Sequence, residues 1–179
     1  MNFLDLIKKG RHQAIMTYVR TCKYLTIEEE LALIRRGCHQ EIMAYITEHW
    51  FEVEPFAEFL QKRNYNEMRH YLSCHQIVYD GMWKQVFSLG EGIVNEVIDY
   101  ILSDMDTELR AKIFDENKFI NKWDDVMCLI LDVKDHCAIR RLITKVKLGP
   151  KSETKLLTEG NAEDNFVYDL VWGQLHRIH

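Results

Sequence analysis

Two stretches of the chain repeat the same order of apolar and polar residues, at positions 6–19 and 33–46. The match is nearly residue for residue at an offset of 27 residues. In the second stretch, Ile42, Met43, Tyr45 and Ile46 fall at i, i+1, i+3 and i+4, which gives a helix with one apolar stripe. An internal repeat of this length is typical of stacked helical units.

Weaker copies extend the repeat over nearly the whole chain. Each copy has a small or turn-forming residue at its centre, where one helix would end and the next begin. These six hinge positions are Gly10, Gly37, Asn64, Gly92, Asn121 and Gly160. Each unit is therefore predicted to be a hairpin of two helices whose apolar side is buried only by stacking on its neighbours.

Local signals support particular helix ends. Thr26 followed by Glu29 forms a capping-box pattern, and Pro55 suits the first turn of a helix. Residues 138–146 have helical spacing outside the regular period, so they predict an extra helix, which Gly149-Pro150 would end. A further helix is expected to be capped at Ser152.

The sequence at 30–37 followed by that at 40–46, with its copy within residues 4–19, resembles repeats of bacterial proteins built from short helical repeats. More broadly, it is similar to HEAT-like and variant leucine-rich α-solenoids. The resemblance implies a right-handed stack and a scaffold or binding role, and it brings no active site. The repeat and the resemblance together predict an all-α, short right-handed α-solenoid of about six helical hairpins, forming one domain over residues 1–179.

Composition agrees with this class and limits the partners. The 179 residues include only 2 prolines and 8 glycines, fewer turn residues than a many-stranded sandwich needs. The net charge of −5 argues against a general nucleic-acid binder. There is no signal-peptide pattern, no apolar run that could span a bilayer, and five scattered cysteines. We therefore expect reduced thiols, a cytoplasmic location and no membrane partner.

Six basic residues precede the first three hinges and form what we call the basic ladder: Lys8, Lys9, Arg35, Arg36, Lys62 and Arg63. In a regular stack they would line one edge and could contact a phosphate backbone or an acidic partner. The alternative is that they complement helix C-termini and the acidic start of the following helix, for example Arg36 beside Glu41. The sequence favours this alternative because the total charge is negative.

Aromatic and metal-ligating residues give further candidates. Trp50 and Trp83 lie outside the apolar stripe and are the better candidates for an exposed contact with a partner, with packing between repeats as the default interpretation. Recurring tyrosines inside the stripe are expected to pack in the core, with their hydroxyls reaching a neighbouring backbone. His70 and Cys74 are spaced i, i+4, but no second ligand pair has matching spacing, so neither a metal nor another cofactor is predicted.

No phosphate-binding loop, nucleophile elbow or metalloprotease motif is present in the sequence. We therefore predict a non-catalytic scaffold that binds another protein. The second hypothesis is a nucleic-acid-associated, HEAT-like protein that uses the basic ladder. The sequence leaves the oligomeric state open.

Overall fold

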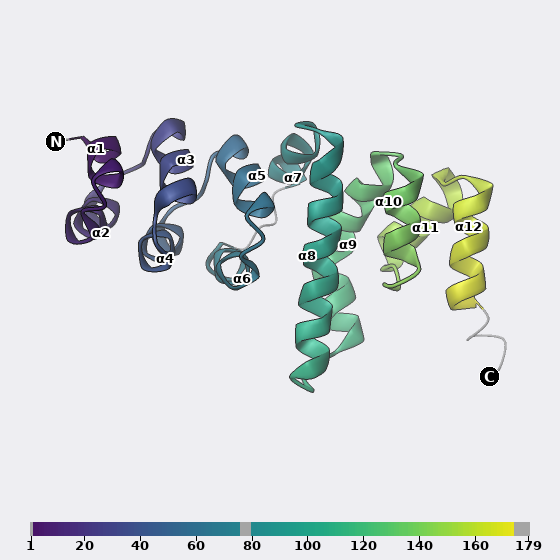
Figure 1. Ribbon diagram of the computed structural model, residues 1–179. Helices are drawn as coiled ribbons and strands as arrows, with labels where there is room; N and C mark the ends of the chain where they lie inside the picture. The colour runs from purple at the N-terminus through teal and green to yellow at the C-terminus, as the bar shows by residue number, and fades with distance from the viewer. Residues whose placement is uncertain (1, 76–79, 174–179) are drawn as a thin grey trace. The chain divides into compact units, whose positions relative to one another are not determined.

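The computed structural model describes residues 2–75 and 80–173, and within these residues the regular structure is helical, without strands. The prediction of an all-α protein is confirmed (Figure 1). The chain separates into two compact units, Met1–Leu89 and Gly90–His179. The expectation that they form one domain stays a prediction. None of the described helices combines the length and apolar character needed to cross a membrane.

The first unit consists of two rows of helices. Its helices are α1 (Phe3–Lys8), α2 (His12–Thr21), α3 (Ile27–Arg36), α4 (His39–Glu48), α5 (Val53–Gln61), α6 (Tyr65–Cys74) and α7 (Asp80–Phe87). One row runs α1, α3, α5, α7 and the other α2, α4, α6, each helix packed on the next in its row (Figure 1). Within this unit, the arrangement is compatible with the stacked hairpins that the repeat predicted.

Aromatic side chains fill the space between the two rows. Tyr45, Phe56 and Tyr71 are fully buried. The hydroxyl of Tyr71 accepts a hydrogen bond from the Phe51 N–H at 3.1 Å. In the second unit the Tyr168 hydroxyl accepts in the same way from the Leu148 N–H. The predicted core role of the repeated tyrosines is confirmed at these positions, and burial raises the pKa of Tyr168 to about 12.

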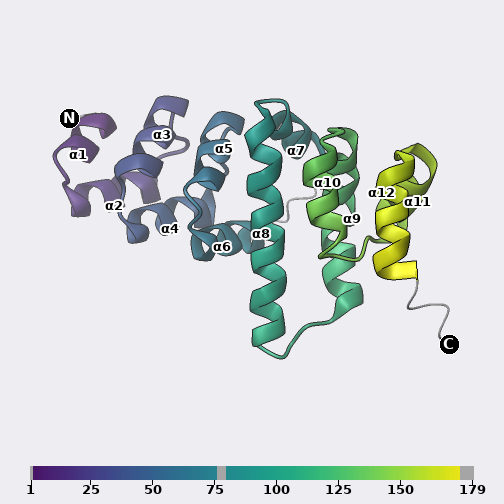
Figure 2. The ribbon, with the colours of Figure 1, turned by 45° about the vertical axis from the view of Figure 1, so that its right-hand side comes forward.

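The second unit begins with two long helices. Its helices are α8 (Glu91–Arg110), α9 (Glu116–Asp132), α10 (His136–Ile143), α11 (Pro150–Glu159), α12 (Ala162–Tyr168) and a π-helical turn, Asp169–Gly173. Helices α8 and α9 lie side by side, α9 packs on α11, and α10 packs on both α8 and α12 (Figure 2). The hinge predicted near Asn121 is wrong, because this residue lies inside α9. The chain turns instead near Lys134, which has a left-handed φ of 59°.

Helix ends follow the sequence signals in part. The capping box of Thr26 and Glu29 is present, and the extra helix around residues 138–146 is α10. Gly37 follows α3 but has a φ of −65°; glycine is needed there because a Cβ would lie 2.5 Å from the Leu33 carbonyl oxygen. The cap predicted at Ser152 is wrong. Gly149 is the N-cap of α11, while Ser152 lies in its first turn and binds Asp124.

Candidate functional site

The strongest candidate site is a groove of about 640 Å³ in the first unit. It lies between two connections, the one from α2 to α3 and the one from α4 to α5. Because equivalent helices of successive hairpins pack side by side, equivalent connections lie at the same edge. The side chains used in the argument below are Lys23, Tyr24, Glu48, Trp50, Glu52 and Met82.

Two aromatic side chains make the groove suitable for binding. Tyr24 is 71% exposed and Trp50 is 41% exposed. The Trp50 ring lies 4.8 Å from the ring of buried His75, whose Nε2 is 2.6 Å from the Ile46 carbonyl oxygen. Trp50 is therefore supported from behind by a fixed side chain. An aromatic group held in this way loses little conformational entropy when it contacts a partner.

A buried carboxylate connects the lining of the groove to the next helix. Glu30 accepts a hydrogen bond from the Tyr45 hydroxyl at 2.6 Å and one from the Glu52 N–H at 3.0 Å. Glu52 is the N-cap of α5, so Glu30 of α3 satisfies a backbone donor at the start of the following hairpin. Burial is the main cause that raises the pKa of Glu30 from 4.5 to about 7.

This shift predicts a pH-dependent stability. A raised pKa means that the folded state disfavours the ionised carboxylate of Glu30 relative to the unfolded state. The contribution of Glu30 to the free energy of unfolding is therefore fully present below about pH 4.5 and is lost as the pH rises through 7. The loss approaches about 3 kcal/mol, from 1.36 kcal/mol per pKa unit. We expect Glu30→Gln to remove this part of the pH dependence. Urea denaturation between about pH 5 and 8 measures it, and the exposed Glu48→Gln variant should keep the wild-type slope.

The two candidate tryptophans have different surroundings. Trp50 lines the groove, whereas Trp83 on α7 is only 3% exposed. The Trp83 ring packs edge-on against Phe56 at 5.4 Å and lies 6.0 Å from Phe87. The suggestion that Trp83 is an exposed contact is therefore wrong, because packing of α7 on α5 covers its ring.

All six residues of the basic ladder are exposed, at the ends of α1, α3 and α5 (Lys8, Lys9, Arg35, Arg36, Lys62 and Arg63). Two of them make contacts between neighbouring hairpins. The Arg35 guanidinium binds both oxygens of the Glu58 carboxylate, and Lys62 Nζ donates to the Ile34 carbonyl oxygen at 3.0 Å. Part of the ladder is thus used within the stack.

The acidic residues that were expected to balance the ladder make other contacts. Glu41 is buried, and its Oε1 lies 2.9 Å from Nδ1 of His12. Glu67 is buried in the same way, with its Oε1 2.8 Å from Nδ1 of His39. One carboxylate that does pair with the ladder is Glu58, which binds Arg35. The suggested pairing of Arg36 with Glu41 is replaced by the contact of Glu41 with His12.

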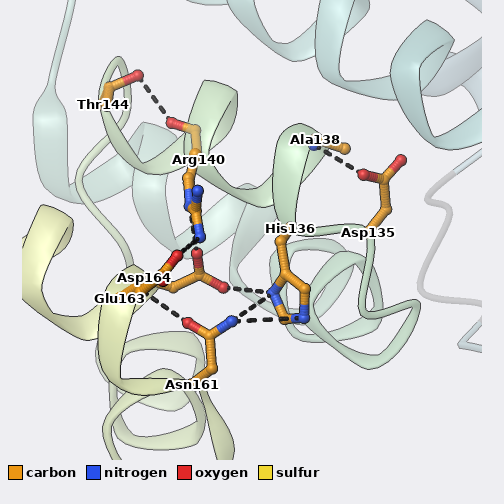
Figure 3. A network of polar contacts seen from close by, with 8 residues as sticks. All are labelled: Asp135, His136, Ala138, Arg140, Thr144, Asn161, Glu163 and Asp164. Atoms are coloured by element: carbon orange, nitrogen blue, oxygen red, sulfur yellow. Dashed lines mark hydrogen bonds and ion pairs between the residues drawn. The ribbon is translucent and has the colours of Figure 1, made fainter.

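The second unit contains the same contact in a larger network (Figure 3). Asp164 Oδ2 lies 2.7 Å from His136 Nδ1, and Asp164 Oδ1 accepts from Arg140 Nε at 2.8 Å. Arg140 also pairs with Glu163, and Asn161 caps the backbone of Asp164 at 2.7 Å. These residues connect α10 with the start of α12, beside a pocket of about 400 Å³.

Within the part of the chain that the structure describes, a histidine–carboxylate contact thus joins neighbouring hairpins at three places. The histidine is the first residue of the second helix of one hairpin, and the acid is the third residue of the second helix of the next. The sequence showed His12 and His39 at one repeat position and acids near helix starts, but not that the two were partners. Their separation of 28 or 29 residues, one repeat length, was the available signal.

Comparison with known protein families, curated proteins and solved structures found no match to the chain. The likeness to helical-repeat proteins is therefore supported at the level of an all-helical fold.

Proposed function

We propose that this protein is a non-catalytic helical-repeat scaffold, built as a short α-solenoid, that binds another protein through the groove containing Tyr24 and Trp50. The observation that carries the proposal is the presence of two exposed aromatic side chains in a groove between successive hairpins. Aromatic residues supply much of the energy at protein interfaces. The five free cysteines agree with the reducing, cytoplasmic location that we expect from the sequence.

The groove favours a partner segment that carries a basic side chain next to an apolar one. Glu48 and Glu52 are exposed carboxylates in its lining, against the single lysine Lys23. Trp50 offers a ring face that attracts a cation as well as apolar groups, whereas the Tyr24 ring already has the Lys23 ammonium 5.3 Å from its centroid. Met82 adds a flexible apolar surface. A guanidinium or ammonium group could therefore contact the carboxylates while its neighbour covers the rings.

Selection of random peptides on the purified protein tests this function. We expect enriched sequences to combine arginine or lysine with an apolar or aromatic neighbour. The double variant Tyr24→Ala/Trp50→Ala should bind a selected peptide at least about tenfold more weakly, because both ring contacts are lost. Isothermal titration calorimetry measures the affinities, and far-UV circular dichroism verifies that the variant is folded.

Phe166→Ala is the matched control, because Phe166 is 68% exposed but lies on α12 in the other unit. It should leave the affinity unchanged. Selection without enrichment, or peptides that bind the double variant as tightly as the wild type, would contradict the proposal.

A second candidate function is nucleic-acid binding through the basic ladder. It is favoured by the exposure of all six side chains, and Lys8, Lys9 and Arg36 form no ion pair within the described residues. Salt-dependent binding of DNA or RNA that disappears when Arg35, Arg36, Lys62 and Arg63 are changed together to Ser would support it. The absence of binding at low salt would rule it out.

A further inference from the structure

Three potential metal ligands meet where the first two hairpins join. They are His12, the first residue of α2; Cys38, the N-cap of α4; and Glu41, in the first turn of α4. Nδ1 of His12 lies 2.9 Å from Glu41 Oε1 and 3.5 Å from Cys38 Sγ. One nitrogen, one sulfur and one oxygen thus lie within 4.8 Å of one another.

The equivalent positions in other hairpins lack the sulfur. His39 faces Glu67 and His136 faces Asp164, but the N-cap there is Asn64 or Asn161, whose side-chain oxygen accepts a hydrogen bond from the acid's N–H. Asparagine is a preferred N-cap residue and cysteine is not. The joining of hairpins therefore explains the histidine and the acid at all three places, and the capping box with Glu41 explains the backbone position of Cys38, but neither explains why this N-cap residue carries a thiol.

Two of the three distances in this cluster, those from His12 Nδ1 to the sulfur and to the oxygen, are close to those around a tetrahedral ion. Bonds of about 2.0–2.1 Å to nitrogen and about 2.3 Å to sulfur place these two ligand atoms about 3.5–3.6 Å apart at a tetrahedral angle. The observed separation of Nδ1 and Sγ is 3.5 Å. The nitrogen and oxygen, now 2.9 Å apart, would have to separate by only a few tenths of an ångström.

We propose that His12, Cys38 and Glu41 form a binding site for a divalent transition-metal ion of the zinc class. Thiolate, imidazole and carboxylate together suit such an ion better than Mg²⁺ or Ca²⁺, which prefer oxygen ligands. Binding releases the thiol proton of Cys38 to solvent, and His12 binds the metal as the tautomer with its proton on Nε2, so that Nδ1, which now faces Glu41, gives its lone pair to the metal. Three protein ligands leave the fourth tetrahedral position to water or to a group from outside.

Part of the ligand set is already held in place. Glu41 is 4% exposed, and its second oxygen, Oε2, accepts a hydrogen bond from the Cys38 N–H at 2.8 Å. This contact fixes the carboxylate relative to the thiol that would share the ion with it. Cys38 itself is exposed, which gives an ion access from solvent. The site is independent of the peptide-binding groove proposed above, since it uses none of the same residues.

Titration with Co²⁺, a spectroscopic substitute for Zn²⁺, tests the site. The probe is cobalt chloride added to the metal-stripped, reduced full-length protein. We expect one ion per chain, with a sulfur-to-cobalt charge-transfer band and tetrahedral d–d bands that Zn²⁺ removes by displacement. Cys38→Asn should abolish the charge-transfer band and weaken binding at least about 100-fold. This variant recreates the asparagine present at the equivalent positions 64 and 161, so its fold should be retained.

Two matched variants identify the site. His39→Gln alters the equivalent contact that lacks a thiol, and it should leave the titration unchanged. Cys74→Ser removes a thiol that lies 3.4 Å from His70 Nε2, and it should also have no effect. A titration without a charge-transfer band, or a band that persists in folded Cys38→Asn, would overturn the proposal. Loss of the band in Cys74→Ser instead would place the ion elsewhere and overturn it equally.

Discussion

Replacing Asp164 by Ala is expected to lower the free energy of unfolding by about 1–3 kcal/mol, the cost of losing charge-assisted hydrogen bonds to a buried carboxylate. Asp164 is 1% exposed and accepts from both His136 and Arg140. Without its carboxylate, His136 and Arg140 would lose their contact across the two helices, although both side chains stay partly exposed and Arg140 keeps its pair with Glu163. The contact between α10 and α12, to which the network belongs, would weaken with it. Urea denaturation followed by far-UV circular dichroism measures the change.

The neighbouring Glu163 provides the control. It pairs with the same Arg140, but its side chain is 78% exposed, so Glu163→Ala should cost less than about 1 kcal/mol. Because both acids pair with Arg140, the difference between the two losses in free energy of unfolding measures the effect of burying the carboxylate. Equal costs for Asp164→Ala and Glu163→Ala would show that the buried network does not stabilise this unit.

Replacing Trp83 by Ala should also be strongly destabilising, by about 3–5 kcal/mol. The Trp83 side chain is 3% exposed and fills the space against Phe56 and Phe87. Removing it leaves a large cavity between α5 and α7, which the surrounding helices can fill only in part. Urea denaturation of the variant gives the loss of stability directly.

Trp50→Ala is the corresponding control, because it makes the same substitution at a more exposed position. We expect it to lower stability by less than Trp83→Ala does, because Trp50 is 41% exposed, while it weakens peptide binding. For Trp83→Ala the larger effect should be on stability. A Trp83→Ala variant as stable as the wild type would contradict the burial of this side chain.

The groove and the proposed metal site differ in how far sequence could predict them. Trp50 was a candidate because it falls outside the apolar stripe, and it does line a groove. Tyr24 could not be linked to it, because the two residues lie on different connections, 26 residues apart. The histidine next to Cys38 in the sequence is His39, whereas the histidine that contacts its thiol in the fold is His12, the preceding copy of the same repeat position.

The sequence by itself determined the helical class and the core role of four of the repeated tyrosines, Tyr45, Tyr71, Tyr100 and Tyr168. These depend on local properties, namely the helical spacing of apolar residues, the capping box at Thr26 and the repeat of about 27 residues. Only the tertiary structure decided the partner of each buried acid, the burial of Trp83 and the grouping of His12, Cys38 and Glu41. Each depends on which side chains face each other across two packed hairpins, and spacing along a single helix does not contain that information.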